Sequence, residues 1–188
     1  MTGVTAVHAL AATGVGPGDT VVIHGAAGGV GLMAVQLAVA DGARVIGTAS
    51  EAAHAQLRRL GAEPVAYGDG LLDRLRDLAP GGVDAAIDTV GTDEAVDVSV
   101  ALVADRDRIA TLAAARRGLE LGLKVLGGAP GADPGVEVRE AARLELVRRA
   151  EAGTLSVLVA GTYPLAQAAD ALRRLAGGHT HGKIVLIP

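Results

Sequence analysis

The stretch TVVIHGAAGGVG, residues 20–31, joins a strand-like apolar segment to a glycine-rich turn and then to a helix-like segment. Its first part holds three β-branched residues in succession, at positions 21–23, which is typical of a buried parallel strand. The segment after the turn has an apolar stripe at helical spacing, formed by Val30, Ala34, Leu37 and Ala38. A strand, a glycine turn and a helix in this order predict a site for the pyrophosphate of a dinucleotide, facing the N–H groups at the helix start.

The small residues of this turn are the first candidates for cofactor binding. Glycine at position 28 lets the backbone approach a pyrophosphate without a Cβ in the way, and glycine at position 31 lets the helix pack against the strand. The first position of the fingerprint is alanine instead of the usual glycine, so the motif departs from its common form. The predicted cofactor-binding residues of the turn are Ala26, Gly28, Gly29, Val30 and Gly31.

Strand-like and helix-like segments alternate along the rest of the chain. Further strands are predicted at residues 43–48, 64–66, 83–87, 108–113 and 123–126, and helices at residues 51–60, 71–78, 93–103 and 137–152. A last helix is predicted with Pro164 in its first turn, and its apolar face is formed by Leu165, Ala168, Ala169, Leu172 and Leu175. This alternation predicts an α/β fold, a doubly wound parallel sheet of the Rossmann-like, three-layer αβα kind. The length of 188 residues suits one domain, and residues 127–135 are the most loop-like stretch.

Composition excludes several classes of function. The net charge is −4 and the arginines are scattered, so the chain offers no basic surface for nucleic acid. It has no apolar run of the roughly 18 residues that a membrane span needs and no basic, signal-like N-terminus, so we expect a cytoplasmic protein that does not contact the membrane. The absence of cysteine excludes disulfides, thiolate chemistry and cysteine-bound zinc.

Six motifs in order give the chain a family resemblance: TAVHAL at 5–10, HGAAGGVGLMAVQLA at 24–38, VIGTAS at 45–50, LRRLGAE at 57–63, GVDAAIDTVG at 82–91 and GHTHGKIVLIP at 178–188. The chain resembles the medium-chain dehydrogenase/reductase superfamily, in its zinc-free quinone oxidoreductase and enoyl reductase branch. The resemblance implies hydride transfer from a nicotinamide cofactor to an activated C=C or carbonyl of a small-molecule substrate. It also implies a substrate domain that this chain lacks, contacted by an N-terminal helix at 2–13 and a final strand at 182–187 that is without its usual partner.

The end of the second predicted strand indicates which cofactor is bound. An NAD site places a carboxylate there, whereas this chain has Thr48, Ala49 and Ser50, so NADP(H) is predicted, with NADPH preferred. Ser50 has two readings, a donor to the 2′-phosphate and the N-cap of the next helix. The resemblance implies a lysine three residues later, where this chain has Ala53, and a tyrosine against the 2′-phosphate, for which Tyr67 is the candidate; packing is its alternative role.

The remaining polar candidates have weaker arguments. Asp88 ends the fourth strand, where ligands gather in α/β sheets, and it either orients the glycine turn or caps the next helix. His24 is expected to be a hydrogen-bonded histidine of the sheet, and Lys183 to be structural. His179 and His181 have metal-like spacing but no third ligand nearby, so no metal site is predicted. No catalytic residue is identified.

Two enzyme classes are excluded. A short-chain dehydrogenase needs a lysine four residues after its tyrosine, but Tyr67 is followed at that spacing by Leu71 and Tyr163 by Gln167. A zinc alcohol dehydrogenase needs ligands that this chain does not show. The alternative to an oxidoreductase is a non-catalytic dinucleotide-binding or protein-interaction module.

A homodimer through a sheet edge is also predicted. In the quinone reductases that the chain resembles, nucleotide domains pair along the strand that here is residues 123–126. The charge of Lys124 protects this edge against pairing, which is the alternative. Residues 184–187 offer a second edge that lacks a partner.

Overall fold

The computed structural model describes residues 1–177 and 182–188, and its centre is a six-stranded sheet in which every pairing is parallel. The strand order is β3-β2-β1-β4-β5-β6. The strands are β1 (Thr20–His24), β2 (Arg44–Ala49), β3 (Glu63–Ala66), β4 (Ala85–Asp88), β5 (Ile109–Thr111) and β6 (Lys124–Val125). The order reverses between β1 and β4, which is where ligands bind in open α/β sheets.

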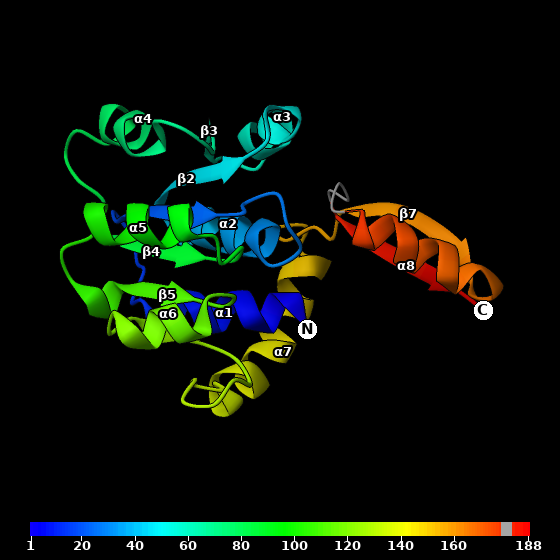
Figure 1. Ribbon diagram of the computed structural model, residues 1–188. Helices are drawn as coiled ribbons and strands as arrows, with labels where there is room; N and C mark the ends of the chain where they lie inside the picture. The colour runs from blue at the N-terminus through cyan, green and yellow to red at the C-terminus, as the bar shows by residue number, and fades with distance from the viewer. Residues whose placement is uncertain (178–181) are drawn as a thin grey trace.

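Helices cover both faces of this sheet (Figure 1). Side chains of α1 (Thr2–Ala12), α2 (Gly31–Ala40) and α3 (Glu51–Arg59) share one apolar cluster with Val21 and Ile23 of β1, and α7 (Val136–Glu151) packs on α1. Side chains of α4 (Leu71–Leu78) and α5 (Asp93–Leu102) form a second cluster with Val22, and α6 (Ala115–Glu120) packs on β5 and β6. A short 3₁₀ helix, Arg106–Arg108, precedes β5. The predicted three-layer, doubly wound, Rossmann-like fold is confirmed.

Alternation along β1 explains the two clusters. Odd-numbered residues of β1 face α2, and even-numbered residues face α5, because successive side chains of a strand point to opposite faces. β1 is flanked by β2 and β4, and its last four residues are all buried. A central strand with two covered faces needs apolar residues at nearly every position, which is why residues 21–23 are β-branched in succession.

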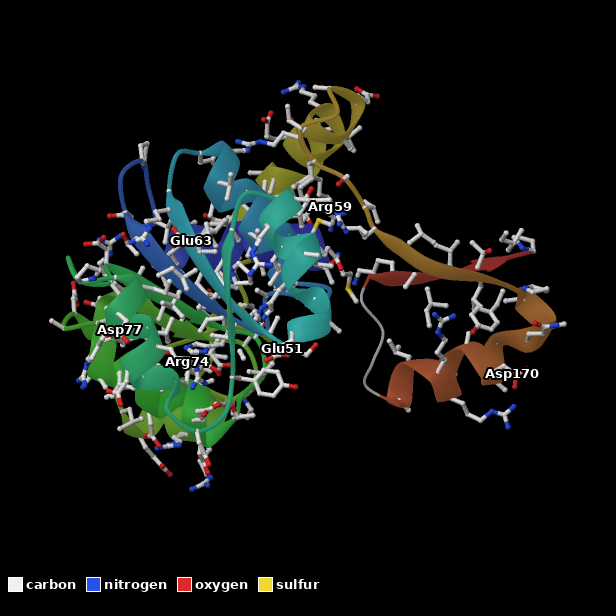
Figure 2. The ribbon with its side chains drawn as sticks, turned by 90° about the horizontal axis from the view of Figure 1, so that it is seen from above. Glu51, Arg59, Glu63, Arg74, Asp77 and Asp170 are labelled. Carbon is white, nitrogen blue, oxygen red and sulfur yellow. The ribbon has the colours of Figure 1, made fainter. Side chains whose placement is uncertain are left out.

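A second, smaller unit follows the six-stranded sheet. It consists of β7 (Val159–Pro164), the 3₁₀ helix Leu165–Gln167, α8 (Ala168–Ala176) and β8 (Lys183–Ile187), and we call it the β7–α8–β8 unit. β7 and β8 pair in parallel and form a two-stranded sheet of their own. Figure 1 shows the unit extending away from the main sheet, and in Figure 2 Asp170 of α8 lies far from Glu51 and Arg74.

The C-terminal region corrects two expectations. β7 was not predicted, and β8 has a partner, because β7 pairs with it from Val159 to Pro164. An apolar face predicted for the last helix, formed by Leu165, Ala168, Ala169, Leu172 and Leu175, is largely exposed, and the one residue of α8 that is fully buried is Ala171. The helical spacing was correct, but the described residues place no neighbour over that face.

Elsewhere the predicted elements differ from the structure mainly at their ends. α4 has its predicted bounds, whereas β5 is three residues long instead of six and β6 two instead of four. β6 is short because the loop that follows it returns to its edge: the Asp133 N–H donates to the Val125 carbonyl at 2.8 Å, and the Gly127 N–H donates to the Asp133 carbonyl at 2.8 Å. Part of the loop-like stretch 127–135 therefore protects the sheet edge.

Candidate functional site

A cavity of about 810 Å³ opens at the carboxyl ends of the central strands, and we call it the carboxyl-end cavity. It lies at the point where the strand order reverses, between the turn after β1, the ends of β2 and β3, and the start of α5. Its lining residues are Thr2, His24, Gly25, Ala27, Gly28, Gly29, Val30, Thr48, Ala49, Ser50, Tyr67, Thr89, Val90, Thr92, Glu94, Ala95 and Lys183. The volume falls within the range of about 300–1,000 Å³ that is typical of small-molecule sites.

The glycine turn depends on a residue that the motif analysis did not single out, Gly25. Its φ is +72°, and a Cβ there would lie 2.6 Å from Thr89 Oγ1 and 2.6 Å from Val90 Cγ1. Both the backbone conformation and the space therefore require glycine. The left-handed residue of the turn precedes Ala26, which explains why alanine is accepted at the first position of the fingerprint.

Ala26 and Gly31 lie beneath the turn and do not line the cavity. A Cβ on Gly31 would lie 2.2 Å from the Gly25 carbonyl oxygen, so only glycine allows α2 to start this close to the strand. Ala26 is fully buried, and its Cβ would lie 2.7 Å from a Cβ built on Gly47 of β2. These residues shape the turn from behind.

Gly28, Gly29 and Val30 line the cavity itself. The Gly28 N–H donates to the Gly25 carbonyl at 2.9 Å, which closes the turn, and its carbonyl accepts from the Leu32 N–H at 2.9 Å. A Cβ on Gly29 would lie 2.5 Å from Lys183 Nζ, so the ammonium group of β8 sits directly over the turn. The part of the cavity next to the helix start thus has backbone donors and one cation, the chemistry that binds an anion.

A buried polar row crosses the sheet at the floor of the cavity. The strand register places Thr48, His24, Asp88 and Thr111 side by side on β2, β1, β4 and β5. All four are at most 3% exposed. Thr111 Oγ1 donates to Asp88 Oδ2 at 2.7 Å, and Thr48 Oγ1 lies 3.4 Å from His24 Nδ1. Polar side chains in such a buried position are tolerated because they bond one another.

Asp88 fixes the turn after β4 and does not line the cavity. Its Oδ1 accepts from the N–H groups of Val90 at 2.9 Å and Gly91 at 2.8 Å. Its hydrogen bonds therefore hold the loop before α5, while the N-cap of α5 is Thr92, whose side chain accepts from the Ala95 N–H. These contacts match neither of the two roles considered for Asp88, because they include neither the glycine turn nor the N-cap of α5.

His24 has an unsatisfied nitrogen within the cavity floor. It is 1% exposed and lines the cavity, and its Nε2 has no hydrogen-bond partner among residues 1–177 and 182–188. Burial lowers its pKa to about 4, against the opposing effect of the nearby Asp88 carboxylate. The ring is therefore neutral at physiological pH. The sequence predicted a hydrogen-bonded histidine of the sheet, and this prediction is wrong for the Nε2 atom.

The far end of the cavity is formed by Ser50 and Tyr67. Ser50 occupies the N-cap position of α3 and lines the cavity, and its side chain makes no capping hydrogen bond to the described residues of that helix. Tyr67 follows β3 and is 61% exposed, which does not suit a packing role. Thr48 and Ala49 complete this end, and the position after Ser50 where a lysine was sought holds Ala53, which is buried.

Two charged residues of the cavity were missed by sequence reasoning. Lys183 was assigned a structural role, because nothing in its own segment shows that β8 returns to the glycine turn. Glu94 lies in the first turn of α5, where an acid is ordinarily explained by the helix dipole alone. Both residues reach the cavity through the path of the folded chain, and no local sequence pattern predicts their presence there.

Zinc does not fit the residues present. Within residues 1–177 and 182–188, no group of three or more histidine, aspartate or glutamate side chains is placed to hold a metal ion, and the chain has no cysteine. His179 and His181 lie outside the described residues.

Comparison with known proteins places the chain in a family. The profile of the family described as zinc-binding dehydrogenase matches residues 29–129, which is more than half of the sequence. The chain belongs to the zinc-binding dehydrogenase family. The resemblance to medium-chain dehydrogenase/reductases is thereby confirmed, and the chain is an NAD(P)-binding domain of that family, related to quinone oxidoreductases.

Two of three representative relatives match almost the whole chain. The quinone oxidoreductase of Escherichia coli, solved in complex with NADPH, is 29% identical with a TM-score of 0.83, and the match covers 100% of this chain and 63% of that one. A polyketide synthase subunit of Mycobacterium tuberculosis, named for phenolphthiocerol and phthiocerol, is 34% identical over 97% of this chain and 9% of its own length. A probable quinone oxidoreductase of Schizosaccharomyces pombe is 47% identical over 40% of this chain and 24% of its own length.

This member of the zinc-binding dehydrogenase family thus spans less than two thirds of the relatives that it matches. No helix among the described residues is long and apolar enough to cross a bilayer.

Proposed function

We propose that this chain is the cofactor-binding part of an NADPH-dependent oxidoreductase of the quinone, enoyl or alkenal reductase kind. The observation that supports it most is the carboxyl-end cavity, which combines the glycine turn, the start of α2 and Lys183 in one space. A dinucleotide needs such a combination, because its pyrophosphate is an anion that must approach the backbone closely.

The two ends of the cavity would bind different parts of the cofactor. Gly28, Gly29 and the N–H groups at the start of α2 would hold the pyrophosphate, with Lys183 as the cation over Gly29. Thr48, Ser50 and Tyr67 would hold the adenosine end. Ala26 and Gly31 would contribute indirectly, by allowing the turn to pack closely. Asp88 would contribute by holding the loop before α5. When bound, the cofactor supplies the hydride that reduces an activated C=C or carbonyl.

The preference for NADPH over NADH follows from the end of β2. No carboxylate is present at Thr48, Ala49 or Ser50 to repel a 2′-phosphate, and the Ser50 hydroxyl is not used by α3. The relative from Escherichia coli was solved with NADPH, and so was a mycobacterial protein with a TM-score of 0.81 and 30% identity. These observations support NADPH as the preferred cofactor.

Calorimetric titration with NADPH and with NADH tests the proposal. Gly28→Val should abolish binding, because a branched side chain fills the space that the pyrophosphate needs. Gly81→Val is the matched control, since a Cβ at Gly81 meets nothing within 4 Å, and it should bind like the wild type. Absence of binding by the wild type at millimolar nucleotide, or unchanged binding by Gly28→Val, contradicts the proposed site, provided that circular dichroism shows both variants folded.

A binding module without catalysis is the second candidate function. The relatives are longer than this chain, and hydride transfer needs donor and acceptor atoms held about 3 to 3.5 Å apart, which requires a wall on the substrate side. We expect the 188-residue chain to bind NADPH without turning over quinones or enals. A kcat in the common range of about 1 to 10³ per second would show that this chain builds a complete active site.

A further inference from the structure

The carboxyl-end cavity contains an acid at the end where none was expected. Glu94, in the first turn of α5, is half-buried and lines the cavity together with Tyr67, Thr92 and Ala95. Among the described residues that line the cavity, it is the one carboxylate, and Lys183 is the one lysine or arginine. The two charges lie at different parts of the wall, because Lys183 sits over Gly29 whereas Glu94 is bonded to the turn after β3.

Glu94 is held in place by that turn. Its Oε2 accepts from the Gly68 N–H at 3.0 Å, and Gly68 directly follows Tyr67. The other side of the turn is held by Arg74 of α4 (Figure 2), which donates to the carbonyls of Ala66 at 2.8 Å and Gly68 at 3.0 Å. Glu94 of α5 and Arg74 of α4 therefore both form hydrogen bonds to the turn after β3, and these bonds hold the carboxylate next to Tyr67.

The negative charge of Glu94 is not neutralised by an ion pair. No salt bridge of the described residues includes it, and the guanidinium of Arg74 donates to backbone carbonyls. Its neighbours differ: Asp93, one residue earlier, and Asp97, one turn later, both pair with Arg117. Glu94 is thus the carboxylate of α5 that has no ion pair among the described residues, and its charge can interact with a ligand bound in the cavity.

The inference rests on the proposed binding of a nicotinamide dinucleotide. We propose that Glu94 is a specificity-determining residue at the adenosine end, and that its carboxylate opposes a 2′-phosphate while accepting a hydrogen bond from a 2′-hydroxyl. The acid that usually ends the second strand of an NAD site is here supplied from α5. It limits the preference for NADPH that the uncharged end of β2 otherwise gives, so the wild type retains affinity for both cofactors.

The direct test is Glu94→Gln, which keeps a carbonyl oxygen for the Gly68 N–H and removes the charge. The affinities for NADPH and NADH are measured by calorimetry at low salt, and the ratio of the two should shift toward NADPH by roughly 5- to 10-fold, as expected for removing one charge near a phosphate in a partly shielded site. The shift should shrink at high salt. Glu94→Ala removes the acceptor as well as the charge and should also weaken NADH binding.

Asp93→Asn is the matched control, because it removes the same charge from the same helical turn at a residue that is paired with Arg117 and does not line the cavity. Its cofactor ratio should equal that of the wild type. The inference is overturned if Glu94→Gln binds both cofactors with a ratio within about 2-fold of the wild type, or if Asp93→Asn shifts the ratio equally. A wild type that binds neither cofactor overturns the proposed function itself and the inference with it.

Discussion

The six-stranded sheet and the β7–α8–β8 unit are built from similar patterns but differ in what covers them. On α3, Leu57 is fully buried beneath the main sheet, whereas Leu172 of α8 is 65% exposed. Both helices have apolar residues at helical spacing, and α8 is at least as amphipathic as α3. The difference teaches that periodicity identifies the face that a helix can bury but not whether a neighbour is present to cover it.

The largest contrast should come from truncating a leucine in each region. Leu57→Ala should lower the free energy of unfolding by about 2 to 5 kcal/mol, because it leaves a cavity in a close-packed core. Leu172→Ala should change it by no more than about 0.5 kcal/mol, as is usual for exposed positions. Urea unfolding followed by circular dichroism measures both. Equal losses would mean that α8 is covered in solution by something outside the described contacts.

The buried row beneath the cavity should make the main sheet sensitive to acid. Burial lowers the pKa of His24 to about 4 in the folded state, against the usual 6.5 of an exposed histidine, so the unfolded state binds more protons between these two values. Stability is therefore full above pH 6.5 and is lost as the pH falls toward 4, by at most about 3 kcal/mol.

His24→Gln removes this titration while the chain's carboxylates stay the same. The difference in unfolding free energy between wild type and variant should change between pH 7 and pH 4 in the direction given above. A difference that is independent of pH over this range would show that the ring is already protonated, or solvated, in the folded protein.

Lys183 links the two regions, since it belongs to the smaller unit and lines the cavity of the larger one. Lys183→Met should weaken NADPH binding by about 10-fold, because a charge-assisted contact to the pyrophosphate is lost. The midpoint of unfolding should barely change, because Lys183 takes part in no ion pair of the described residues. Calorimetry and thermal unfolding separate the two effects, and a variant that loses stability but not affinity would reverse the assignment.

The smallest effect concerns assembly. Because Asp133 already occupies the Val125 carbonyl at the β6 edge, we expect any homodimer to form through β8, whose Val185, Leu186 and Ile187 are exposed. Light scattering should then show that Val125→Pro stays dimeric and that Leu186→Pro becomes monomeric. A monomeric wild type would exclude a homodimer through either edge, and a monomeric, folded Val125→Pro would restore the β6 edge as the interface.

The main sheet could be predicted from the sequence because the patterns that indicate it are local. The β-branched residues 21–23, the glycine turn and the helical spacing after it all concern neighbours in the chain, and the parallel pairing of the strands follows from their alternation with helices. The lining of the cavity by Gly28, Thr48, Ser50 and Tyr67 follows in the same way, since parallel strands end at one edge.

What the sequence did not reveal depends on contacts between distant segments. The strand Val159–Pro164 contains a glycine and ends in proline, so its pattern is weak, and its pairing with β8 decides its structure. Lys183 and Glu94 reach the cavity only through the path of the folded chain. Among the described residues, the Nε2 of His24 has no hydrogen-bond partner, because the row across the sheet offers one on one side of the ring only.

The position of Lys183 over Gly29 also sets an order of events during synthesis. Roughly 150 residues separate the two, so at about 5 to 20 residues per second the glycine turn leaves the ribosome about 8 to 30 seconds before the lysine that completes its anion site. In that interval the six strands can pair while the cavity still lacks its cation. We therefore expect the main sheet of a nascent chain to fold before the chain can bind its nucleotide.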